Sequence, residues 1–270
     1  MQNRYAGDVG DFMKLGLLRY VAALPSDGGA GLTMGLNWYL APDEGHNTDG
    51  KHISYLQPSN RHHHALRVCD PDLMHCLGRV VEHGRTVQAL EECGALPTKS
   101  PTHAEMLDPV GGAVGRGLAM APSGTEALAG ADAAFVDPDN GIRSAAQGSK
   151  VHKFALIGEL ADYAARGQSL FAYHHADRSA DVRTQAERRL HELADGVGQE
   201  PVGAVIARRG TCRFFLITAA RDTTTYWSPA CRHLDLPSHG LSDDGCDRPV
   251  PRSTERASGG NGSSTSWTAR

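Results

Sequence analysis

Apolar residues along the chain recur in two patterns, one typical of amphipathic helices and the other of buried strands. The helical pattern predicts a first helix over residues 11–23, where Phe12, Leu15 and Leu18 share one face and Asp8 or Asp11 is available as an N-cap. The same spacing predicts helices over residues 70–92, with a break near Gly84, over 153–165 and over 181–194. Short apolar runs bounded by turn residues predict strands over residues 32–40, 53–56, 102–107, 133–136, 169–174, 202–207 and 212–219.

Strands and helices alternate in this order of elements, which indicates a doubly wound, mostly parallel α/β sheet of the Rossmann-like kind. The last two strands are separated by Arg208-Arg209-Gly210-Thr211, which predicts an antiparallel hairpin that closes the sheet. From residue 228 onward, Ser, Gly, Pro and Arg dominate and the periodicity is lost. We therefore expect one α/β domain over residues 1–228 and a low-complexity, disordered tail over 229–270. His62-His63-His64 is expected in a solvated loop.

The composition of the 270-residue chain suits a globular protein and narrows its class. A net charge of −4 gives no overall basic character for nucleic-acid binding, although a local basic groove remains compatible with it. No apolar run approaches ~18 residues and no secretory apolar segment follows Met1, so we expect no membrane span and a cytoplasmic location. The 6 cysteines include no Cys-x-x-Cys pair, which favours free thiols over a structural zinc site.

The most informative stretch is the strand over residues 133–136, which ends abruptly in Asp137-Pro138-Asp139-Asn140-Gly141. Ligands of open α/β sheets bind beyond the carboxyl ends of such strands, so both carboxylates should stand at the rim of the sheet. The same residues are also typical of a turn. Two carboxylates exceed what a turn requires, which favours a functional site. His174, at the end of the next predicted strand, is a candidate general base, with a polar strand end as the alternative.

Asp137-Pro138-Asp139-Asn140 resembles the Asp/Asn-Pro-Pro-aromatic motif of amino-methyltransferases, although Asp139 and Asn140 replace the second proline and the aromatic residue. A sheet closed by a strand hairpin likewise resembles the class I S-adenosylmethionine-dependent methyltransferase fold. The opening Gly7-Asp8-Val9-Gly10-Asp11-Phe12-Met13-Lys14 is similar to a motif of the enzymes that methylate adenine N6 in ribosomal RNA. The resemblance implies that the 137–140 loop orients a target amine and that Lys14 meets the carboxylate of S-adenosylmethionine.

A second polar cluster, residues 43–52, directly follows the first predicted strand. Asp43 or Glu44 can bind a ribose through its hydroxyls, as acidic residues do in dinucleotide-binding folds. Metal binding is a second interpretation, because Asp43, His46, Asp49 and His52 offer ligands at a spacing of three residues. Pro42-Asp43 followed by Asp49-Gly50-Lys51 is also similar to a nuclease pattern whose carboxylates hold Mg²⁺. A plain solvated loop is the remaining interpretation.

These observations lead to three hypotheses of function. The first is S-adenosylmethionine-dependent methyl transfer to a nitrogen of a nucleic acid or another polar substrate. Its expected catalytic residues are Asp137, Asp139, Asn140 and His174, and its expected cofactor-binding residues are Asp8, Asp11, Lys14, Asn37, Asp43 and Glu44. The second is a metal-dependent nuclease or phosphoesterase, in which Asp43, Asp49, Asp137 and Asp139 would hold Mg²⁺ or Mn²⁺. The third is a non-enzymatic binding module.

Overall fold

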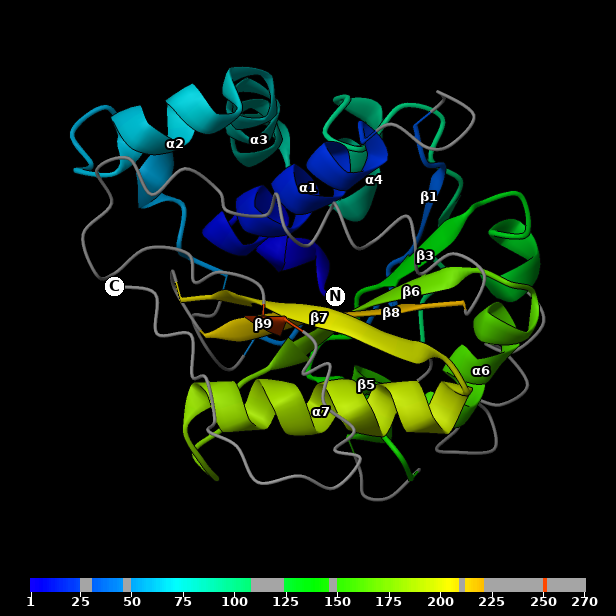
Figure 1. The fold of residues 1–270 in the computed structure, drawn as a ribbon. Coiled ribbons are helices and arrows are strands. Elements are labelled where there is room, and N and C mark those ends of the chain that lie inside the picture. The colour runs from blue at the N-terminus through cyan, green and yellow to red at the C-terminus, as the bar shows by residue number, and fades with distance from the viewer. Residues whose placement is uncertain are drawn as a thin grey trace.

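A mostly parallel sheet runs through the middle of the protein, as the computed structural model in Figure 1 shows. The structure describes residues 1–24, 31–45, 50–107, 124–145, 150–208, 212–220 and 250–251. Seven strands of these residues pair in the order β2-β1-β3-β6-β8-β7-β9, and β8 and β9 run opposite to the others. A separate parallel pair is formed by β4 and β5.

The central strands are short and apolar, because helices or loops cover both of their faces. Ala133–Val136, which forms β3, is buried at every position, and its Phe135 pairs with Leu36 on one side and with Phe171 on the other. The strands are β1 (Met34–Asn37), β2 (Thr102–His103), β3 (Ala133–Val136), β4 (Gly141–Arg143), β5 (Phe154–Leu156), β6 (Ser169–His175), β7 (Glu200–Ala207), β8 (Arg213–Ala219) and β9 (Val250–Pro251).

Helices lie on both faces of this sheet, and two separate groups of buried apolar side chains fill the space between. Figure 1 shows α1, α2, α3 and α4 on one side and α6 and α7 on the other. Their bounds are α1 (Val9–Ala22), α2 (His63–Cys69), α3 (Pro71–His83), α4 (Val87–Glu92), α6 (Ile157–Ala165) and α7 (Val182–Val197). Short 3₁₀ helices span Asn3–Tyr5, Ser54–Leu56 and Val151–Lys153.

Local capping explains where the longer helices begin and end. Asp8 caps α1 by accepting hydrogen bonds from the backbone N–H groups of Gly10 and Asp11, and Asp181 caps α7 in the same way. Pro71 stands in the first turn of α3, which ends at Gly84 with φ +128°. The helices predicted over residues 11–23, 70–92 and 181–194 are therefore confirmed, with the break near Gly84. Most of their observed ends lie within three residues of the predicted ends.

The mixed α/β class, its Rossmann-like character and the closing antiparallel pair β7/β8 are likewise confirmed. Three local predictions are wrong. Residues 54–56 form a 3₁₀ helix instead of a strand, His63 and His64 open α2 instead of lying in a loop, and the helix expected from Lys153 begins only after β5. The two-residue strand β9 falls within the predicted disordered tail, whose other residues beyond 229 lie outside the described part of the chain.

No helix in the described ranges has the length and apolar character needed to cross a bilayer.

The loop that follows β3 needs a glycine where it turns into β4. Gly141 has φ +114°, and a Cβ atom there would lie 2.9 Å from the Cα of His174. We expect Gly141→Ala to lower the free energy of unfolding, measured by urea denaturation, by about 1–3 kcal/mol or more. The strain of a positive φ and the overlap of the new Cβ atom with His174 both contribute to this loss. Gly78→Ala is the matched control: it lies inside α3 with open space around its Cα, and should stabilise by up to ~1 kcal/mol. Equal effects of the two substitutions would contradict this account.

Candidate functional site

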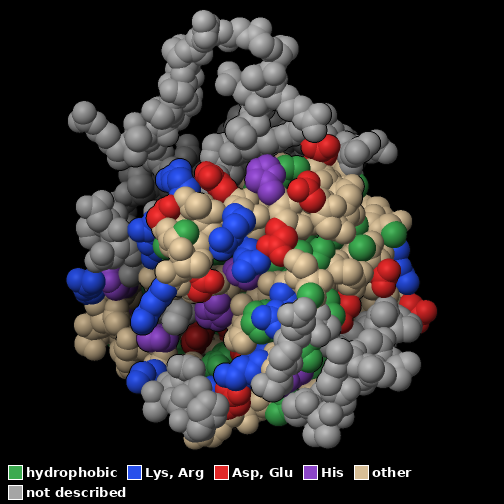
Figure 2. Space-filling model, turned by 90° about the horizontal axis from the view of Figure 1, so that it is seen from below, with side chains coloured by type: hydrophobic (Ala, Val, Ile, Leu, Met, Phe, Trp, Pro, Cys, Tyr) green, Lys and Arg blue, Asp and Glu red, His purple; other side chains and the backbone are tan. Residues whose placement is uncertain are grey.

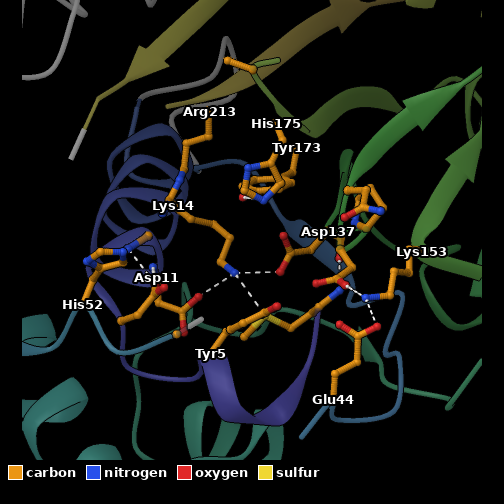
Figure 3. A pocket seen from close by; sticks show the side chains of 18 of the residues that line it. Tyr5, Asp11, Lys14, Glu44, His52, Asp137, Lys153, Tyr173, His175 and Arg213 are labelled. Carbon is orange, nitrogen blue, oxygen red and sulfur yellow. Dashed lines mark hydrogen bonds and ion pairs between the residues drawn. The ribbon is translucent and has the colours of Figure 1, made fainter. Parts of the chain in front are cut away.

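A cavity of about 440 Å³ opens at the carboxyl edge of the sheet, between α1 and the loops that follow β1, β3 and β6 (Figure 3). Within the sheet, β2 pairs with one edge of β1, and the chain then returns to form β3 along the other edge of β1. The carboxyl ends of β1 and β3 therefore form a topological switch point, where open α/β sheets bind their ligands. The volume lies within the range of small-molecule sites.

Lys14 joins two carboxylates at the centre of this site. Its Nζ lies 2.7 Å from Oδ1 of Asp11, in the same helix, and 2.7 Å from Oδ2 of Asp137, directly after β3. Burial by itself would lower the pKa of Lys14, but the charges of Asp11 and Asp137 outweigh burial and hold that pKa above its usual value. Burial raises the pKa of Asp11 to about 6, against the opposing charge of Lys14. The lysine is therefore a permanent cation that ties α1 to β3.

A second lysine holds the other side of the same loop. Lys153 Nζ lies 2.6 Å from Oε1 of Glu44 and 3.0 Å from Oδ2 of Asp139, which also accepts a 2.8 Å hydrogen bond from Gln2. Burial opposes ionisation of Asp139, yet the N-terminal ammonium, Gln2 and Lys153 together keep its pKa below the usual value. Asp139 is therefore a carboxylate at neutral pH, fixed by a lysine and an amide.

The paired carboxylates keep acceptor atoms for a ligand. Each lysine engages Oδ2 of its aspartate, and the Oδ1 atoms of Asp137 and Asp139 accept no hydrogen bond from the described residues. The Oδ2 atom of Asp8 likewise accepts no hydrogen bond from the described residues, because both N–H groups that cap α1 bond to Oδ1. The backbone carbonyl of Asp137 accepts a 2.8 Å hydrogen bond from the ammonium group of Met1. Three carboxylate oxygens thus remain for positively charged or N–H groups in the cavity.

The alternation of β6 decides which of its polar residues reach the cavity. Tyr173 and His175 line it, and the Tyr173 hydroxyl lies 2.7 Å from Nε2 of His175. His174 points to the opposite face, where its Nδ1 accepts a 3.0 Å hydrogen bond from the Ile142 N–H and its ring stacks on Phe214. This placement removes the basis for the predicted catalytic role of His174 and brings His175 to the site instead. Burial lowers the pKa of His174 to about 3 and that of His175 to about 4, so both rings are neutral.

The structure brings together most of the residues that the sequence singles out. Asp8, Asp11, Lys14, Glu44, Asp137, Asp139 and Asn140 all line the cavity. Asn37 does not, because its side chain bonds to the Tyr163 hydroxyl at 2.9 Å and to the Tyr39 N–H at 3.1 Å. Asp43 accepts a 3.2 Å hydrogen bond from the Arg4 N–H outside the cavity lining, and Asp49 and His46 lie outside the described residues.

Three further residues, Lys153, His175 and Arg213, line the cavity although the sequence did not lead us to place them among the expected site residues. Strand parity could have selected His175, since only every second residue of β6 faces the cavity. No local signal marks Arg213, which is buried against Gly10 so closely that a Cβ atom at residue 10 would overlap its guanidinium group. Within the described ranges, no three His, Cys, Asp or Glu residues are arranged to hold a metal ion.

The two buried histidines make stability depend on pH. The unfolded His174 titrates near 6.5, whereas the folded ring stays neutral down to about pH 3, so its contribution is complete above pH 6.5 and is lost on acidification. We expect His174→Asn, whose Oδ1 can accept the Ile142 N–H in place of Nδ1, to reduce the loss of unfolding free energy between pH 6.5 and 5 by about 2 kcal/mol. Urea denaturation at both pH values measures this difference. An unchanged pH dependence would show that folding does not lower the pKa of His174.

We compared the chain with protein-family models, with curated proteins and with solved structures. No protein-family model, no curated protein and no solved structure matches the chain.

Proposed function

We propose that this protein is an S-adenosylmethionine-dependent methyltransferase, which transfers a methyl group to a nitrogen of a nucleic acid or another polar substrate in the cavity at the carboxyl ends of β1, β3 and β6. The observation that carries the proposal is the pair of fixed carboxylates after β3. Asp137 and Asp139 each give one oxygen to a lysine and keep the other for a ligand. Such acceptors suit an amine whose lone pair must point in a set direction.

The described residues fit the charged groups of the methyl donor. An ammonium group has three N–H donors, and two of those of Lys14 bind Asp11 and Asp137. Among the described residues, Nζ otherwise lies 4.0 Å from the Met1 sulfur and 5.1 Å from the centre of the Trp38 ring, and neither contact is a strong hydrogen bond. Lys14 therefore retains a donor for a carboxylate. The uncommitted oxygen of Asp8 is suited to an ammonium group, and Glu44 to ribose hydroxyls. The sheet, doubly wound in this proposal and closed by β7 and β8, is consistent with the fold of this enzyme class.

Each chain residue has a defined task in the proposed reaction. S-adenosylmethionine supplies an electrophilic methyl group on sulfur. Asp137 and Asp139 accept the N–H bonds of the target amine and direct its lone pair into the cavity, while Lys14 and Lys153 keep both side chains in one orientation. His175 is neutral and hydrogen-bonded to Tyr173, and burial disfavours its protonated form, so the pair orients the bound amine and the proton that the amine loses passes to solvent water.

The lysine pairs favour this proposal over a metal-dependent nuclease or phosphoesterase. Of the four aspartates expected to hold Mg²⁺ or Mn²⁺, Asp137 and Asp139 each already neutralise a buried lysine, and Asp43 lies outside the cavity lining. A binding module without catalysis would use the same cavity, and only turnover distinguishes it from an enzyme.

The direct test is calorimetric titration of the protein with S-adenosylmethionine. We expect binding in the micromolar range, weakened about tenfold in Asp8→Asn, because an amide at this position still caps α1 but no longer attracts an ammonium group. Asp181→Asn is the matched control, since it makes the same change at the N-cap of α7, and it should leave binding unchanged.

Other results would refute the proposal. No binding of S-adenosylmethionine, together with binding of Mn²⁺ that is lost in Asp139→Asn, would establish the metal-dependent alternative. Lys14→Ala is avoided in this test, because removing one partner of a buried ion pair costs about 3–5 kcal/mol of stability and would confuse loss of binding with unfolding.

A further inference from the structure

A second hollow of about 520 Å³ lies outside the cavity, between α2, α3 and the segment that leads into α2. Its apolar lining comes from Leu56, Pro58, Pro71, Met74 and Val81. We call this hollow the α2/α3 groove. No residue of the proposed reaction lines it, so it is a separate surface that the proposed function does not explain.

The polar lining of the α2/α3 groove is mainly basic. Arg67 and Arg79 come from α2 and α3, and His63 and His75 accompany them, whereas Glu82 is the acidic residue of the lining. Arg67, His75 and Arg79 are exposed. Neither guanidinium group forms a hydrogen bond or ion pair with the described residues, which leaves ten N–H donors for a ligand.

The combination of these groups points to one class of ligand. Single-stranded nucleic acid is bound through phosphates by arginine, and its bases stack on guanidinium planes and imidazole rings or rest on apolar surface. The α2/α3 groove offers all of these in one hollow. An acidic peptide would use the same charges but would gain little from two imidazole rings beside an apolar lining.

Residues only four positions apart in the sequence line the cavity and the α2/α3 groove. His52 lines the cavity and Leu56 lines the groove, so at most about 14 Å of chain separates them. Arg85, which follows α3, donates to the backbone carbonyls of Gly50 and Ala6, and it therefore fixes this link at the cavity's edge. A strand of a few nucleotides spans such a distance.

We infer that the α2/α3 groove binds the phosphate backbone of a single-stranded nucleic acid and presents one of its bases to the cavity. The inference rests on the proposed function, since it names nucleic acid as the substrate class. It also bears on position 140, where the methyltransferase motif that the loop resembles has an aromatic residue. Asn140 cannot stack on a base, and binding at the groove would replace part of that stacking energy.

The test uses fluorescence anisotropy of a labelled 20-nucleotide single-stranded RNA of mixed sequence with the full chain, at several salt concentrations. We expect the double variant Arg67→Ala/Arg79→Ala to bind at least about tenfold more weakly at 50 mM salt. The slope of log K against log salt should fall by about 1.4, because each lost phosphate contact removes about 0.7.

The matched control is Arg183→Ala/Arg188→Ala, which removes two exposed arginines from α7. Figure 2 shows the molecule from below, the side on which α7 lies in Figure 1, and basic and acidic side chains are interspersed over the described part of this face. The control should change RNA affinity by less than about twofold. Equal weakening in both double variants would overturn the inference, because the contribution would then be one of net charge alone.

Calorimetry with S-adenosylmethionine on the same proteins separates this inference from the proposed function. Unchanged donor binding by Arg67→Ala/Arg79→Ala, together with loss of RNA binding, supports the groove. If the wild-type protein binds S-adenosylmethionine but no RNA, or binds vesicles of anionic lipid in its place, the inference fails while the methyl-transfer proposal stands. If it binds neither RNA nor the donor, both fail.

Discussion

Lys14 carries a positive charge that is almost wholly removed from water, and the carboxylates that balance it come from its own helix and from a loop 123 residues away. Taking such charges out of water is costly, and only close, well-oriented partners offset the cost. The three groups therefore hold one another in a single arrangement. Because Lys14 lies in α1 and Asp137 ends β3, this arrangement fixes the helix over the carboxyl edge of the sheet. The wall and the base of the cavity are defined by the same interaction.

A second set of charges fixes the other side of the cavity. Lys153 draws Asp139 and Glu44 together, so the carboxylates around the cavity are held by cations while each aspartate after β3 keeps one oxygen. The imidazole of His175 stays neutral beside these charges, because burial disfavours its protonated form. The cavity is therefore lined by both signs of charge, with acidic and basic groups fixed in place. The proposed methyl transfer would use the carboxylate oxygens that the lysines leave.

The surface around α2 and α3 differs, because Arg67 and Arg79 lie over an apolar lining and their guanidinium groups pair with none of the residues that the structure describes. The segment of residues 50–58 connects the two regions, and Arg85 fixes one end of it. Substrate anchoring and chemistry would then lie in adjacent but separate parts of the fold. Such a division allows a substrate to be held by its backbone while the reacting group is positioned by the carboxylates.

Much of this architecture follows from local rules that the sequence displays. Continuous apolar runs such as Ala133–Val136 predict buried parallel strands, and Asp8 or Asp181 before a periodic segment predicts a helix. The carboxylates after β3 were therefore predictable as a site. Short segments were not: residues 54–56 and 63–69 have too few positions to show a period. Residues 54–56 pack against α2, and α2 packs against α3, so tertiary contacts accompany both conformations.

The sequence alone determined the α/β class, the ends of the main helices and the presence of a polar site at the end of β3. The tertiary structure decided which charges meet. Lys14 reaches Asp137, Lys153 reaches Glu44, and Arg213 packs against Gly10, across separations along the chain that no local pattern encodes. It also decided that His175, and not His174, faces the cavity. Local propensity is set by neighbouring residues, whereas the pairing of buried charges is set by the packing of whole elements.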